Sequence, residues 1–128
     1  MTGYLAFGLI RYHQLTGDTH VLKLLHLLAE GLYAESKRSS GIFNYSPFPQ
    51  INNLWVKTDK ARWNAMNTLF GGLCGYLYFV SGEKIYAQRA IECYPTQKSF
   101  DQGASVGMDM LPLAGWMLRV VAQFKEKN

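Results

Sequence analysis

The sequence has 128 residues, of which 48% are hydrophobic and 17% are charged, and its formal net charge is +4. Disordered chains have the opposite balance, with few apolar and many charged residues, so composition excludes disorder. A chain of this length fits one domain, and we expect residues 1–128 to form a single one. The positive charge permits acidic partners without requiring them.

Nothing in the sequence predicts insertion into a membrane. The longest apolar run, residues 69–80, contains glycines and is shorter than the roughly 20 residues that a membrane-spanning helix needs. The two cysteines, Cys74 and Cys93, form no C-x-x-C pair, and Cys74 lies in the apolar run, which indicates a buried thiol. We therefore expect a reducing, cytoplasmic location.

The first two predicted helices cover residues 2–15 and 19–37. Apolar residues surround most of the first helix, which predicts burial on most sides, and leucines recur in the second at helical spacing. Gly17 is expected to end the first helix in a left-handed conformation, and Asp18 to cap the second. So short a connection predicts an antiparallel hairpin.

A second predicted hairpin joins residues 64–81 to residues 83–94 through Gly82, before Pro95. Its turn aligns with the first one at an offset of 65 residues, Leu15–Asp18 against Val80–Glu83, which predicts a weak internal repeat. Three glycines in the third helix lower its intrinsic helix propensity, and we expect them to allow close approach of a neighbour. These are Gly71, Gly72 and Gly75.

A fifth helix is predicted over residues 108–124. Asp109 would cap it, and Pro112 would lie in its first turn, where proline is tolerated. The alternative is a longer helix that is kinked at Pro112. Arg119, with the lysines that follow, would favour the negative C-terminal end of the helix dipole.

Residues 39–63 form a predicted loop between the two hairpins that is longer than connections in compact domains usually are, and such loops are often functional. A sugar ring stacks its C–H face on an aromatic plane, while amide and guanidinium groups bind its hydroxyls. The loop and the residue after it therefore predict a carbohydrate-binding site made of Phe43, Tyr45, Trp55, Arg62, Trp63 and Asn64. The alternative is that these rings fold the loop back onto the helices.

The stretch from Gly8 to Asp18, followed by a leucine-rich helix, resembles the hairpins of the (α/α) six-hairpin toroid superfamily, and so does Gly72 to Glu83. Many members of that superfamily act on carbohydrates, as glycoside hydrolases, polysaccharide lyases or sugar epimerases. The resemblance covers about Gly3 to Tyr94 and implies that helices one and three are inner helices and two and four outer ones. A toroid has twelve helices, whereas this sequence predicts five.

The expected fold is therefore all-α, with antiparallel helical hairpins that resemble part of a toroid. The chain would be a piece of a longer protein or a shortened relative that closes its core by self-association. A simple helical-repeat array is the competing architecture, but the 65-residue offset and the long loop argue against it.

No motif predicts a reaction. Glycoside hydrolysis needs two carboxyl groups about 5–10 Å apart, and Asp59 and Asp109 are the candidate pair. The alternatives are a solvated loop residue and a helix cap. His13, His20 and His26 do not have the spacing of a metal set, and no phosphate-binding or dinucleotide motif is present, so we expect neither metal nor cofactor.

Two functional hypotheses follow. The chain binds an oligosaccharide, as a carbohydrate-binding or glycosidase-like protein, or it is a structural module that self-associates into a homo-oligomer through the exposed surface of its inner helices. Aromatic and basic residues in the loop could also stack on single-stranded nucleic acid, but no nucleic-acid fold signature accompanies them, so we do not expect it as a partner.

Overall fold

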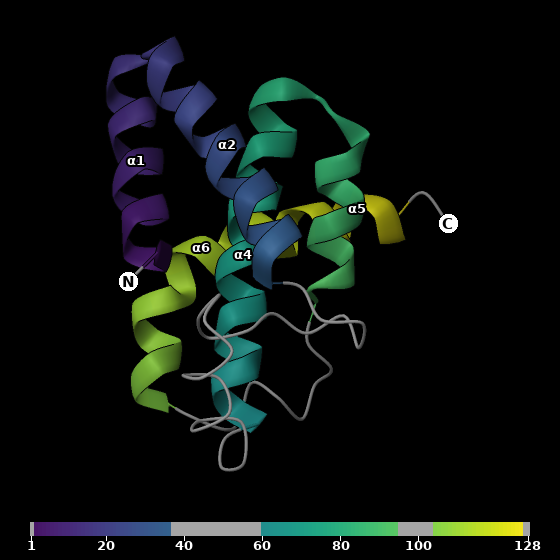
Figure 1. Ribbon diagram of the computed structural model, residues 1–128. Helices are drawn as coiled ribbons and strands as arrows, with labels where there is room; N and C mark the ends of the chain where they lie inside the picture. The colour runs from purple at the N-terminus through teal and green to yellow at the C-terminus, as the bar shows by residue number, and fades with distance from the viewer. Residues whose placement is uncertain (1, 37–59, 95–103, 127–128) are drawn as a thin grey trace.

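In the computed structural model, the described residues are 2–36, 60–94 and 104–126, and their regular secondary structure is entirely helical, with five helices and no strand (Figure 1). The predicted all-α class is therefore confirmed. The helices are α1 (Thr2–Thr16), α2 (Thr19–Ser36), α4 (Lys60–Ser81), α5 (Lys84–Glu92) and α6 (Ala104–Lys125). Figure 1 shows α1 with α2 and α4 with α5 as two hairpins whose turns lie at the same end of the molecule.

The bounds of three helices agree with the sequence prediction to within about two residues at each end, the usual uncertainty of helix ends. The third helix differs, because α4 begins at Lys60 rather than at Asn64. Lysine, alanine and arginine at positions 60–62 are good helix formers, and they extend the helix backwards into the predicted loop. The residues from Lys60 to Trp63 are thus helical.

The fifth helix also starts earlier than predicted, at Ala104, so the prediction that Asp109 caps it and that Pro112 lies in its first turn is wrong. Both residues lie inside α6. Proline in a helix interior removes one hydrogen bond and crowds the preceding turn, which bends the helix. Figure 1 shows α6 changing direction along its length, as the alternative of a longer, kinked helix predicted.

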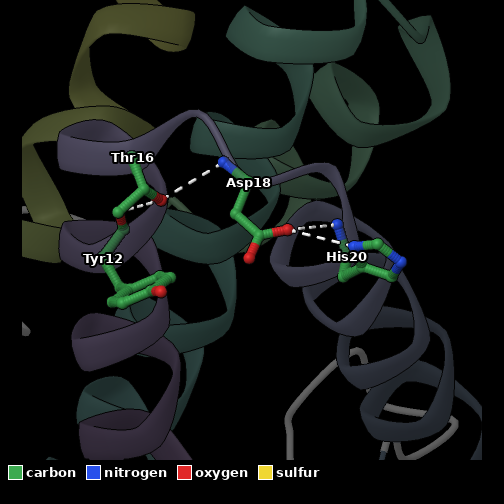
Figure 2. A network of polar contacts seen from close by, with 4 residues as sticks. All are labelled: Tyr12, Thr16, Asp18 and His20. Carbon is green, nitrogen blue, oxygen red and sulfur yellow. Dashed lines mark hydrogen bonds and ion pairs between the residues drawn. The ribbon is translucent and has the colours of Figure 1, made fainter.

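The turn between α1 and α2 is held by local hydrogen bonds (Figure 2). The Thr16 hydroxyl donates to the carbonyl of Tyr12 over 2.8 Å and accepts from the Asp18 amide over 3.2 Å. Gly17 has the left-handed φ of 66°, and Oδ1 of Asp18 accepts the His20 amide over 2.8 Å. The predicted glycine ending and aspartate cap are confirmed.

The turn between α4 and α5 repeats this geometry. The Ser81 hydroxyl donates to the carbonyl of Leu77 over 2.7 Å and accepts from the Glu83 amide over 3.2 Å. Gly82 has a φ of 74°, and its amide donates to the carbonyl of Tyr78 over 2.8 Å, as the Gly17 amide does to that of His13. The predicted repeat is confirmed at its turns, where a hydroxyl and a glycine occupy equivalent positions.

Helix α4 is the centre of the fold. It packs against α1, α2, α5 and α6, and every residue from Phe70 to Leu77 is buried. The thiol of Cys74 is among them, as predicted, and its burial raises its pKa well above the ordinary value. The largest fully buried side chains of the core come from α1, α2, α4 and α6 and from Cys93, which directly follows α5: Ile10, Leu25, Leu73, Leu77, Leu113, Met117, Val120, Cys74 and Cys93.

The glycines of α4 lie where α6 crosses it. A Cβ atom on Gly72 would collide with the backbone of Leu113, and one on Gly75 would lie 2.6 Å from the carbonyl carbon of Trp116. Real Cβ atoms are not found so close to backbone atoms, so the crossing requires glycine at both positions. The prediction that these glycines allow close approach of a neighbour is confirmed, and the neighbouring helix is α6.

Helix α1 is less buried than its sequence predicts. Ala6 and Ile10 are buried, but Leu15 is 87% exposed and Leu5 and Tyr12 are about half exposed. The reason is positional, because α1 packs mainly against α2 and α4, which lie on one side of it. The apolar residues on its other side remain accessible.

We expect Gly72→Ala and Gly75→Ala each to lower the free energy of unfolding by about 3 kcal/mol or more, the upper end of the cost of overpacking, because the obstacle is backbone. Gly31→Ala in α2 is the matched control, since a Cβ there meets nothing within 4 Å, and it should stabilise by up to about 1 kcal/mol. Urea unfolding followed by circular dichroism measures all three. Equal effects in α2 and α4 would contradict the close crossing.

Candidate functional site

The predicted carbohydrate-binding and catalytic residues fall where the structure gives no side-chain geometry. Phe43, Tyr45, Trp55 and Asp59 lie outside the described residues. The other four lie in helices whose side chains at these positions are not described: Arg62, Trp63 and Asn64 at the start of α4, and Asp109 within α6. The loop site and the carboxyl pair stay predictions.

A different feature offers a site whose geometry is defined. A groove of about 360 Å³ lies between α1 and α6, within the size range of small-molecule sites. Helix α1 supplies one wall and the middle of α6 the other. The lining residues are Phe7, Ile10, Arg11, Gln14, Gly115, Trp116 and Arg119.

Each wall carries an arginine that lies over an aromatic ring. The guanidinium carbon of Arg119 is 5.0 Å from the ring centroid of Trp116, and that of Arg11 is 5.7 Å from that of Phe7. Arg11 also donates a long hydrogen bond of 3.4 Å to the Gln14 side chain. A guanidinium held over a ring keeps its N–H groups free to bind a planar anion.

Neither arginine has an acidic partner within the described residues. The ion pairs there join Asp18 to His20 and Glu30 to Arg89, and no Asp or Glu whose side chain the structure describes lines the groove. The groove therefore presents two positive charges that the described protein does not neutralise.

The position of the Trp116 ring is fixed by its contact with the buried ring of Tyr76. The Trp116 ring lies 5.0 Å from that of Tyr76 in an edge-to-face arrangement, and the Tyr76 hydroxyl is 2.5 Å from Nδ1 of His13. Burial raises the pKa of Tyr76, so its hydroxyl stays neutral and remains available for this hydrogen bond. The contacts from His13 through Tyr76 to Trp116 fix the ring on which Arg119 lies.

Gly115 leaves space in the groove. A Cβ atom at this position would meet nothing within 4 Å, although the residue lies in the middle of α6 beside Trp116. A larger side chain would project into the cavity without first displacing other atoms.

The sequence prediction missed this groove because its two arginines come from opposite ends of the chain. Arg119 was assigned to the C-terminal dipole of its helix, but α6 continues to Lys125 and Arg119 lies more than one turn before that end. The available signal was that Arg11 and Gln14 are among the few strongly polar residues in an otherwise apolar helix.

A second polar cluster joins α2 to α5. The guanidinium of Arg89 donates two hydrogen bonds to the Glu30 carboxylate, of 2.6 Å and 3.2 Å, and its carbon lies 4.0 Å from the ring centroid of Tyr33. The Tyr86 hydroxyl donates to the same carboxylate over 3.0 Å and lies 2.8 Å from Nδ1 of His26. Since Tyr86 has one proton, His26 must be the donor in the latter bond.

This cluster is a structural link rather than a ligand site. Arg89 is only 9% exposed, and its guanidinium is already engaged by the Glu30 carboxylate and the Tyr33 ring. Hydrogen bonding from Arg89 lowers the pKa of Glu30, and burial together with Glu30 raises that of Tyr86. Both shifts favour a carboxylate that accepts from a neutral phenol and a charged guanidinium, which is the state that joins the two hairpins.

Among residues 2–36, 60–94 and 104–126, no three histidine, cysteine or acidic side chains are grouped as a metal site would require. In the same part of the chain, no helix combines the length and the hydrophobicity that crossing a bilayer demands.

Comparison with known proteins identifies no relative: no protein-family model, no curated protein and no solved structure matches this chain. The groove and its charges are therefore the evidence on function.

We expect Glu30→Gln to lower the free energy of unfolding by about 1–3 kcal/mol at pH 7, because Arg89 then loses its charged partner. The cost is below that of a fully buried pair, since the Glu30 side chain is 52% exposed. The folded-state pKa of Glu30 lies below its ordinary value of 4.5, so the wild type should hold this advantage at neutral pH and lose it as pH falls below about 4.5.

Chemical denaturation of both proteins from pH 3 to 8 measures the difference. Glu83→Gln is the control, because Glu83 is exposed and its side chain forms no capping hydrogen bond. A Glu30→Gln difference that does not change with pH would show that the carboxylate charge is not what stabilises the link.

Proposed function

We propose that this chain binds an acidic carbohydrate in the groove between α1 and α6. The observation that carries the proposal is that two guanidinium groups, each over an aromatic ring, face one groove without an acidic partner among the described residues. Arginine forms paired, charge-assisted hydrogen bonds with carboxylate and phosphate groups, and these are stronger than bonds between neutral groups. The net charge of +4 favours approach of an anion.

The other groove residues suit the rest of a sugar. Gln14 offers an amide to hydroxyl groups, and the partly exposed Phe7 offers apolar surface to C–H groups. The face of Trp116 is covered by Arg119, so recognition of the ligand through its charge takes precedence over stacking on the indole. This narrows the sequence hypothesis of carbohydrate binding to sugars that carry an acidic group.

We also propose that the fold is similar to part of an (α/α) toroid, which is compatible with carbohydrate binding. This similarity is supported by the hairpin order, by the repeated turn, and by the position of α4, which packs against both α1 and α6. The proposal is binding rather than hydrolysis, because no carboxyl group lines the groove within the described residues, and glycoside hydrolysis uses two.

We expect glucuronate to bind measurably tighter than glucose, and Gly115→Leu to abolish the difference by filling the groove. The substitution changes no charge, and leucine is a better helix former than glycine, so the fold should be retained. Isothermal titration calorimetry with both sugars measures the effect.

Gly31→Leu is the matched control, because Gly31 is an exposed helical glycine with equal space but lies in α2, away from the groove. It should bind glucuronate as the wild type does. Equal binding of glucuronate by the wild type and by Gly115→Leu would place the site elsewhere.

A second candidate function, self-association, is favoured by exposed apolar residues on both helices of the first hairpin. On α1, Leu5, Tyr12 and Leu15 project from one side of the helix, and on α2 Leu24 and Leu27 are 51% and 69% exposed. Apolar residues grouped in this way often belong to protein interfaces. This supports the hypothesis of a homo-oligomer, which is compatible with ligand binding.

If these exposed residues of α1 and α2 join two copies of the chain, light scattering should give an oligomer mass for the wild type. The double variant Leu15→Lys, Leu27→Lys should then give a monomer mass. Both side chains are mostly exposed, so the fold should survive. Ile85→Lys, at a half-exposed residue of α5, is the control and should leave the mass unchanged. A monomeric wild type would reject this function.

A further inference from the structure

We infer that the groove takes a ligand with two negative charges, which lies between Arg11 and Arg119 and so links α1 to α6. This rests on the proposed binding of an acidic carbohydrate and adds to it the number of charges. One negative charge would satisfy the proposed function, whereas the inference requires two.

The two arginines lie on opposite walls of the groove. Arg11 belongs to α1 and lies over Phe7, and Arg119 belongs to α6 and lies over Trp116, so each has its own support on its own wall. Neither arginine is paired with an acidic side chain in the described part of the chain, and both line the same groove of about 360 Å³. A ligand with one charge leaves a net positive charge in the groove, and a ligand with two neutralises both arginines.

The helices that form the two walls of the groove have few direct contacts with each other. Helix α1 packs against α2 and α4, and α6 packs against α4 and α5, whereas α1 and α6 face each other mainly across the groove. A ligand held by both arginines would connect these two helices, which have few direct contacts with each other in the described residues. Binding energy gained by the folded state alone adds to its stability, so such a ligand should also raise the unfolding temperature.

Two chemical sources can supply two charges. A sugar diacid carries a carboxylate at each end and would give one to each arginine. A sugar phosphate carries both charges on one group at neutral pH and would bring the two guanidinium groups to a single point. The shared chemistry is a dianion, and the experiment separates the sources.

The test uses linear six-carbon probes of nearly equal size: sorbitol, which is neutral, gluconate with one carboxylate and glucarate with two, together with glucose 6-phosphate. Calorimetry at pH 7.5 and fixed ionic strength gives the affinities, and thermal unfolding gives the stabilisation. We expect glucarate or glucose 6-phosphate to bind about tenfold tighter than gluconate, as one added charge-assisted contact implies. We also expect the tighter ligand to give the larger rise in unfolding temperature.

The variants Arg11→Gln and Arg119→Gln separate specific pairing from general attraction. Each should reduce the affinity for the dianion about tenfold, to near that of gluconate for the wild type. Lys23→Gln is the control, because it removes the same net charge from an exposed residue of α2 that lies away from the groove. This control should leave the ratio of dianion affinity to gluconate affinity unchanged. An equal loss in all three variants would overturn the inference.

The remaining outcomes distinguish the inference from the function on which it rests. If gluconate binds better than sorbitol but the dianions bind no better than gluconate, the two-charge inference fails and the proposed function stands. If no anion binds better than sorbitol, both fail. Tighter binding of glucarate than of glucose 6-phosphate assigns one carboxylate to each wall, and the reverse order assigns one phosphate to both arginines.

Discussion

The contact that the rest of the structure depends on is the crossing of α4 and α6 at backbone distance. Gly72 and Gly75 remove the side chains that would hold the helices apart, so the backbone at Leu113 and Trp116 rests directly on α4. Glycine in a helix lowers its intrinsic stability, and the packing of two helices without intervening side chains offsets that cost. Because α4 also contacts α1, α2 and α5, the position of α6 is fixed relative to the whole core.

The candidate site follows from this crossing. The backbone of Trp116 touches Gly75, and the ring of Trp116 contacts Tyr76, the next residue of α4. Arg119 is one helical turn further along α6 and lies on that ring. A positive charge at the surface is therefore positioned by glycines in the core, through one indole ring. The Glu30–Arg89 link has a different task, because it joins α2 of the first hairpin to α5 of the second.

The features that the sequence predicted well are those that depend on neighbouring residues. The turns at Gly17 and Gly82 were predicted because each glycine lies directly between two helical patterns, so the signal is contained in a few neighbouring positions. The early start of α6 was missed because Asp109 suggested a cap and because the serine, valine and glycine at positions 105–107 before it have low helix propensity. The groove could not be predicted, since the facing of Arg11 and Arg119 is a product of the α4–α6 crossing and of the hairpin turn, and neither arginine carries local information about the other.

The repeated turn has a consequence for the order in which the chain folds. Each turn is closed by hydrogen bonds between residues no more than four positions apart, and the helices that it joins pack along their length. Contacts that are short in sequence cost little chain entropy and form quickly. The two hairpins can thus close early and independently, whereas the α4–α6 crossing joins Gly72 to Leu113, far apart in the chain, and should form later. The slow part of folding should then be the assembly of the two hairpins and α6 around α4, rather than the formation of either hairpin.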